Sequence, residues 1–157
     1  MAGGGDLRKL MRLFPSGVCV VSAEIDGQRV ATTIGSLVSL SLEPPLVGIS
    51  VGRELALHEL LRTASSFAIS ILRGDQSALA AHFARGVPPL FLWENVAVRD
   101  GSTGAPLLAD ALAWIECTLW ARYDAGDHSI FVGEVAALEE GAPGPALVYR
   151  EHGYHAV

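Results

Sequence analysis

The chain has 157 residues, of which 50% are hydrophobic and 18% are charged, and its formal net charge at pH 7 is −6. This length predicts one domain, residues 1–157, that is large enough to bury a core. The acidic balance disfavours nucleic acid as a partner, because nucleic-acid sites need a positive surface. No apolar run approaches the roughly 18 residues of a membrane span, and the N-terminus lacks a signal-peptide core. We therefore predict a cytoplasmic protein with no membrane partner.

The first part of the chain predicts one short helix followed by an antiparallel meander. Residues 1–5 include three glycines, and we expect them to be disordered. Asp6 is the expected N-cap of a helix that ends near Phe14 and carries apolar residues at helical spacing. A strand over residues 18–25 then reaches Asp26 and Gly27, a strong signal for a two-residue hairpin turn.

The rest of the chain alternates between helical and strand patterns. Helices are predicted over residues 53–64 and 76–84, with a strand over residues 67–72 between them. Residues 85–104 have no sustained period and predict a long loop. Further strands are expected over residues 112–123, 129–138 and 146–149, followed by a tail. Six or seven strands joined by hairpins, with three peripheral helices, predict a mainly β, antiparallel barrel.

The stretch from Val30 to Gly52 departs from an ordinary strand pattern. Hydroxyls and a glycine are interleaved with apolar residues before a corner at Pro44 and Pro45, so the polar groups do not keep to one face. Hydroxyls and backbone N–H groups beside a glycine can hold a phosphate. An edge strand rich in serine and threonine is the alternative interpretation.

Histidine and cysteine give few other candidate sites. His128 lies in the turn Ala125-Gly126-Asp127-His128, where it is either solvated or placed at a barrel mouth. Cys19 and Cys117 lie in apolar runs without metal-ligand spacing, so we predict buried thiols and no metal site. Nucleophile, dinucleotide and phosphate-loop motifs are absent from the sequence.

Structural roles are predicted for three further side chains. Trp114 and Trp120 are expected to share one strand face, in the core or at a subunit interface, and His58 is expected to be solvated on its helix.

Six segments occur in a specific order: FPSGVCVVSA (14–23), TTIGSLVSLSLEPPLVGISV (32–51), SSFAISIL (65–72), HFARG (82–86), GAPLL (104–108) and ALAWIECTLWARYDAGDHSIFVGEV (111–135). This ordered set resembles the flavin reductase family with the FMN-binding split-barrel fold, the reductase components of two-component flavin-dependent monooxygenases. The resemblance implies an antiparallel, Greek-key-like split β-barrel that binds FMN or FAD and takes hydride from NADH or NADPH. It also implies a homodimer and a separate monooxygenase that receives the reduced flavin.

The resemblance assigns site residues position by position. In the family, backbone amides and hydroxyls of the strand before the Pro-Pro corner lie along the flavin, at positions matched by Thr33, Gly35, Ser36 and Ser39. The helix-loop motif places Phe83, with His82 or Arg85, near the cofactor. The turn histidine near the nicotinamide corresponds to His128, the predicted catalytic residue.

Two departures from the family pattern weaken the side-chain contacts to the flavin. Ile34 and Gly35 stand where many members have Ala and Asn or Ser, and Leu55 stands where many have serine. Arg53 is a candidate phosphate partner by charge. These departures imply loosely bound flavin that behaves as a substrate. A flavin-dependent oxidoreductase for an organic substrate and a non-enzymatic flavin- or haem-binding module are the alternatives.

Overall fold

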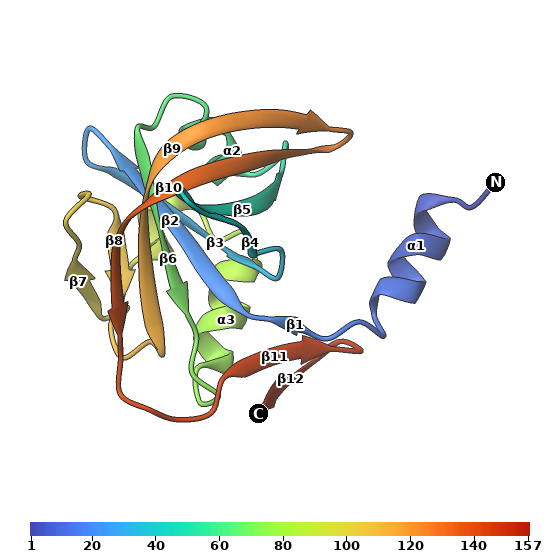
Figure 1. The fold of residues 1–157 in the computed structure, drawn as a ribbon. Helices are drawn as coiled ribbons and strands as arrows, with labels where there is room; N and C mark the ends of the chain where they lie inside the picture. The colour runs from blue at the N-terminus through green and yellow to red at the C-terminus, as the bar shows by residue number, and fades with distance from the viewer.

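A seven-stranded antiparallel sheet forms the body of the molecule (Figure 1). The computed structural model describes residues 1–157. In spatial order the strands are β3 (Gln28–Ile34), β2 (Cys19–Ile25), β6 (Ser66–Ile71), β9 (Ala113–Ala125), β10 (His128–Glu140), β5 (Pro45–Gly52) and β4 (Val38–Leu42). Every neighbouring pair is antiparallel. The predicted mainly β, antiparallel fold class is confirmed.

Two smaller sheets and four helices surround this sheet. The smaller sheets contain β1 (Ser16–Gly17), β11 (Leu147–Arg150) and β12 (Gly153–Ala156), and β7 (Val98–Asp100) with β8 (Pro106–Leu108). The helices are α1 (Gly4–Met11), α2 (Ala56–Leu61), α3 (Ser77–Ala84) and α4 (Pro89–Leu92). The three predicted helices are present, and α4 is an additional single turn inside the segment that we predicted as a loop.

The connection from β3 to β4 is bound to β5 through a serine side chain. The hydroxyl of Ser36, which follows edge strand β3, donates to the carbonyl oxygen of Ser50 in β5 and accepts from the N–H of Ser50, each at 3.0 Å. The main core fills the concave side, with Phe67, Phe131 and Ile49 almost fully buried. A second cluster lies under α3 and α4 and includes Phe83. Because β3 borders both clusters, its residues are held from two sides.

The hydroxyl-rich stretch is two strands and not one. β3 ends at Ile34, and β4 begins only at Val38, with Gly35 to Leu37 forming an unpaired connection. The predicted corner at Pro44 and Pro45 is confirmed, because β4 ends at Leu42 and Pro45 is the first residue of β5. β3 and β4 lie at opposite ends of the sheet order.

The N-terminal helix extends away from the sheet (Figure 1), and none of its residues is buried. It begins at Gly4, whereas the sequence predicted disorder through residue 5 and a cap at Asp6. Asp6 instead accepts a hydrogen bond from the N–H of Gly3 at 3.2 Å. This contact within the first turn allows the glycines to be helical.

Of three predictions about buried side chains, one was wrong, one was half right and one is confirmed. His58 is buried, because its helix packs on β2, β3 and β5 and its ring reaches Ser129 and Phe131 of β10. Trp114 is buried while Trp120 is 54% exposed, because irregularities in the β9–β10 ladder change which face the later residues present. Cys19 and Cys117 are free and buried, as predicted.

No helix in the structure combines the length and the apolar character that a membrane crossing requires.

Candidate functional site

Two hollows lie along β3, and both are lined by Ala84, the last residue of α3. The first, which we call the tyrosine hollow, has a volume of about 240 Å³ and is lined by Ser16, Val18, Thr33, Ile34, Gly35, Ala84, Tyr149 and Tyr154. The second, the proline hollow, has a volume of about 230 Å³, and its walls include Thr32, Glu54, Leu55, Phe83, Ala84 and Pro88. The hollows divide β3 along its length: residues up to Thr32 line the proline hollow, and residues from Thr33 onward line the tyrosine hollow.

Thr33 connects the two walls of the tyrosine hollow. Its Oγ1 donates a hydrogen bond of 2.7 Å to the carbonyl oxygen of Ala80 in α3. Ala80 is fully buried, so this bond fixes the helix against β3. The Thr33 oxygen can still accept a hydrogen bond from a ligand, but its proton is already used.

Gly35 lies where the backbone must approach another strand closely. A Cβ at this position would lie 2.5 Å from Oγ and 3.1 Å from Cβ of Ser16 in β1. Gly35 also lies just beyond the last residue pair of the β2–β3 ladder, Cys19 with Ile34. The missing side chain therefore opens the tyrosine hollow to the backbone, which supports the predicted backbone contact with a ligand.

Ser36 and Ser39 do not line either hollow. Both hydrogen bonds of the Ser36 hydroxyl go to Ser50, so this side chain links β5 to the β3–β4 connection. Ser39 is exposed on β4, paired with Val47 at the far edge of the sheet from β3. Their predicted contacts with the flavin stay predictions, and the Ser36 hydroxyl has a structural partner.

The three predicted residues of α3 and its end have different surroundings. Phe83 is 3% exposed, packs edge-on against His82 and also contacts Trp93, and its ring lines the proline hollow. The Nε2 of His82 donates to the carbonyl oxygen of Leu92 at 2.7 Å, which fastens α4 to α3. Arg85 is exposed at the C-cap of α3 and lines neither hollow. Only Phe83 of this group faces the hollows.

Arg53 and His128 meet at the β9–β10 turn. The N–H of Arg53 donates to the carbonyl oxygen of Asp127 at 3.0 Å, and its guanidinium pairs with Asp124 at 3.0 Å. His128 is exposed, and its Nδ1 donates to the Asp127 carboxylate at 2.7 Å, which holds the pKa of Asp127 below its ordinary value. This hydrogen bond orients the imidazole and leaves Nε2 free.

A short segment of chain joins this turn to the proline hollow. His128 pairs with Gly52 across the β10–β5 ladder, and Leu55, three residues after Gly52, lines the hollow. The structure thus places Thr33 and Gly35 at the tyrosine hollow and Phe83 at the proline hollow. His128 lies on β10, which does not neighbour β3 in the sheet, and is connected to the proline hollow through Gly52 and Leu55.

The residues that line the two hollows suit ligand binding better than hydrolysis. Their polar groups are hydroxyls and backbone, the remaining walls are apolar and aromatic, and the lining of the two hollows contains a single carboxylate, Glu54. No group of three or more histidine, cysteine, aspartate or glutamate side chains could hold a metal ion. Such a surface suits a planar, partly polar molecule that supplies its own reactivity.

Comparison with known proteins agrees with this geometry. The model of the flavin reductase like domain matches residues 11–157. The chain belongs to the flavin reductase family. The predicted family is therefore confirmed over nearly the whole chain.

Curated relatives and solved structures of other flavin reductases cover nearly all of the chain. The reductase component of 4-hydroxyphenylacetate 3-monooxygenase from Thermus thermophilus is 40% identical over 147 residues, 94% of this chain and 92% of that protein. An NADH-dependent FAD reductase from Streptomyces globisporus is 41% identical over 132 residues, 82% of this chain and 72% of that protein. The crystal structure of the flavin reductase component of a bacterial two-component tryptophan halogenase is 38% identical with a TM-score of 0.89, covering 99% of this chain and 98% of that one.

Sequence reasoning missed several hollow-lining residues of this flavin reductase. Tyr149 and Tyr154 are cross-strand partners in the β11–β12 hairpin, with ring centroids 5.2 Å apart. Burial, and then the neighbouring Tyr149, raise the pKa of Tyr154, so its phenol remains a hydrogen-bond donor. The sequence signal for these residues is a pair of tyrosines on either side of a short turn. That spacing is typical of a hairpin, but it contains no motif that indicates a binding site.

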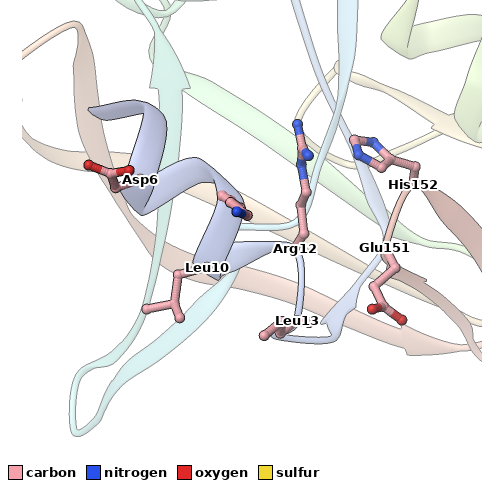
Figure 2. Close-up of a pocket in the computed structure, with 7 residues that line it drawn as sticks. Asp6, Leu10, Arg12, Leu13, Glu151 and His152 are labelled. Carbon is pink, nitrogen blue, oxygen red and sulfur yellow. The ribbon is translucent and has the colours of Figure 1, made fainter. Parts of the chain in front are cut away.

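A larger hollow, of about 430 Å³, lies away from β3 in this flavin reductase. It is bounded by α1 and the β11–β12 turn and is lined by Asp6, Lys9, Leu10, Arg12, Leu13, Glu151 and His152 (Figure 2). Figure 2 shows α1 with Asp6 and Leu10 on one side and Glu151 and His152 on the other. It contains none of the predicted site residues, and its size comes from the projection of α1 away from the body.

Proposed function

We propose that the protein is an NAD(P)H-dependent flavin reductase that supplies reduced FMN or FAD to a separate monooxygenase. The observation that carries this function is the family match over residues 11–157, together with two adjoining hollows along the strand that the family motif marks. A relative that is an NADH-dependent FAD reductase favours NADH as the donor. A relative that is a monooxygenase reductase component supports a separate oxygenase partner.

The chain's residues position the reactants, and the two ligands supply the hydride chemistry. Thr33 and the backbone at Gly35, which line the tyrosine hollow, would hold the flavin, and Phe83 would give it an apolar wall in the proline hollow. His128, held by Asp127, presents Nε2 to the nicotinamide side. When bound, the nicotinamide would supply the hydride that the flavin takes up, so the chain needs no side-chain nucleophile.

The size of the hollows supports loose flavin binding. Each is smaller than the about 300 to 1,000 Å³ of typical small-molecule pockets, so one chain encloses a flavin only in part. Leu55 lines the proline hollow where many members have a serine. Flavin then exchanges between turnovers and is a substrate, as a reductase that hands reduced flavin to a partner requires.

A homodimer is part of this proposal. Helix α1 buries none of its residues, and its apolar residues Leu7 and Leu10 are 59% and 64% exposed. A second copy of the chain that covers α1 would bury this surface and enclose the flavin further. Leu10→Asp would weaken the dimer in sedimentation velocity, whereas Lys9→Asp on the same helix would not. A wild-type monomer at micromolar concentration would refute this part of the proposal.

We place the reaction in the cytoplasm. Two free, buried cysteines suit a reducing compartment, which is also where the reduced nicotinamide pool is kept.

The test follows the absorbance of NADH with and without added FMN, FAD and riboflavin. The expected result is oxidation that depends hyperbolically on added flavin. His128→Ala should raise the KM for NADH or lower kcat, while His155→Ala, an exposed histidine on β12, should leave both unchanged. A tightly bound flavin without NADH oxidation would favour an oxidoreductase for an organic substrate. No flavin binding and no turnover would refute the proposed function.

A further inference from the structure

A separate pocket of about 310 Å³ lies between α2 and the β9–β10 hairpin. We call it the arginine pocket. It is lined by Arg53, His58, Glu59, Arg62, Arg122 and Asp124, and no hydrophobic residue contributes to its wall. Arg122 lies in β9, Arg53 directly follows β5, and Arg62 is the C-cap of α2. Three guanidinium groups thus meet in one place, on a chain whose net charge is −6.

The charges in this pocket are not balanced. Arg53 pairs with Asp124 at 3.0 Å, and Arg62 pairs with Glu59 at 3.1 Å. Arg122 has no carboxylate partner among the ion pairs of the structure. The pocket therefore carries one positive charge that the protein does not neutralise, provided that its histidine is neutral.

His58 is neutral at pH 7 and forms the inner wall of the arginine pocket. It is 7% exposed, its Nε2 lies 2.8 Å from Oγ of Ser129, and its ring meets that of Phe131 edge-on. Burial, and then Arg122, Arg53 and Arg62, lower the pKa of His58 below its ordinary value. The positive charges of all three arginines therefore act on the His58 ring.

The pocket adjoins the predicted nicotinamide residue. The guanidinium Nε of Arg53 donates to the carbonyl oxygen of His128 at 3.4 Å, and its N–H bonds to Asp127. Two residues further along the chain, Leu55 lines the proline hollow. A nucleotide bound against His128 would therefore lie beside Arg53 of the arginine pocket.

We infer that the arginine pocket binds a phosphate group of one of the two nucleotide substrates, with Arg122 as the free guanidinium and Arg53 and Arg62 beside it. Guanidinium groups match phosphate in charge and in paired hydrogen-bond geometry. The wholly polar wall suits a phosphate and does not suit the flavin or nicotinamide rings. This inference rests on the proposed function, since it assigns a subsite to the same reaction.

The test compares Arg122→Gln with Arg12→Gln, an exposed arginine that also has no carboxylate partner. Steady-state kinetics use NADH against reduced nicotinamide riboside, and FMN against riboflavin, so that each pair differs in whether phosphate is present. Arg122→Gln should raise the KM of one phosphate-bearing substrate about tenfold, the loss expected for one charge-assisted hydrogen bond. The KM of the matching phosphate-free compound should not change, and Arg12→Gln should behave as wild type.

The affected substrate identifies the source of the phosphate. A change with NADH alone assigns the pocket to the dinucleotide, and a change with FMN alone assigns it to the flavin. Inorganic pyrophosphate should inhibit the wild type in competition with that substrate, and Arg122→Gln should weaken this inhibition. Unchanged KM values and unchanged inhibition in Arg122→Gln would overturn the inference while leaving reductase activity intact.

Calorimetry with pyrophosphate separates the two hypotheses further. A protein without NADH oxidation that still binds pyrophosphate through Arg122 would refute the proposed function and keep the anion site. A protein with normal reductase activity that binds no pyrophosphate would refute the anion site and keep the proposed function.

Discussion

Replacing Ser36 by alanine separates a structural role from a role in flavin binding. The sequence predicts Ser36 and Ser39 as flavin contacts, but only Ser36 has protein partners. The β4–β5 ladder ends at the pair Val38 with Gly48, so β5 has no strand partner on that edge at Ser50. The Ser36 hydroxyl satisfies both the N–H and the carbonyl of Ser50. Ser36→Ala would remove both bonds at once.

The expected loss follows from these two bonds. A hydrogen bond within a protein contributes about 0.5–1.5 kcal/mol net, so two bonds of 3.0 Å correspond to about 2 kcal/mol. For a chain of this size such a loss lowers the melting temperature by roughly 4–8 °C. Ser39→Ala, at an exposed position, should change the free energy of unfolding by less than about 0.5 kcal/mol.

Urea denaturation and flavin kinetics of the two variants decide the question. If Ser36 acts through the fold, Ser36→Ala lowers stability and raises the KM for riboflavin and FMN by the same factor. Ser36→Thr, which keeps the hydroxyl, should recover most of the stability. The reasoning is refuted if Ser36→Ala is as stable as Ser39→Ala, or if only the KM for FMN rises.

Three further predictions concern the core and its buried ionisable groups. Burial alone would raise the pKa of Glu116, but hydrogen bonds from the N–H and hydroxyl groups of the loop over residues 102–103 lower it. The pKa of Glu116 is lower in the folded than in the unfolded state, so its ionised form stabilises the protein at pH 7 and Glu116→Gln should lower the free energy of unfolding there. In urea titrations the difference from wild type should shrink as the pH falls from about 5 toward 3. A difference that does not change with pH would contradict this. Gly133→Ala should cost about 1–3 kcal/mol in denaturation experiments, because its Cβ would lie 2.6 Å from the Cβ of Cys117, whereas Gly17→Ala has open space and should be near neutral. Burial raises the pKa of Cys19 and of Cys117 to about 12, so neither thiol should react with iodoacetamide in the native protein at pH 8, while both should react in urea; rapid native labelling would show that the thiols are accessible.

The fold could be predicted well from local patterns. The Asp26-Gly27 turn, the Pro-Pro corner and the helical spacing over residues 56–61 each act within a few residues of the chain. The fourth helix was missed because it has one turn and depends on distant partners. Trp93 in the same segment donates from Nε1 to the carbonyl oxygen of Arg29 in β3, at 3.0 Å. No pattern within residues 85–104 reports that contact.

The candidate site could be predicted only in part, for a related reason. The sequence identifies hydroxyls and charges but not the groups to which they bond. Ser36 and His82 have suitable chemistry, yet Ser50 and Leu92 occupy their hydrogen bonds. His58 looked solvated because a histidine beside Glu59 on a short helix is usually exposed, and only the folded structure shows its contact with Ser129 of β10. The same residue types stabilise the fold at some positions and bind ligands at others, so residue type alone does not separate the two roles.

The connection between β5 and α2 makes the two ends of the proposed site mechanically dependent on each other. The N–H of Arg53 is bound to the Asp127 carbonyl, and Leu55 follows after one residue. A substitution at Leu55 that changes the shape of the proline hollow should therefore also shift the β9–β10 turn, which carries His128. Attempts to engineer the flavin preference of this enzyme at Leu55 will also alter its use of the nicotinamide donor. The two specificities must be selected together.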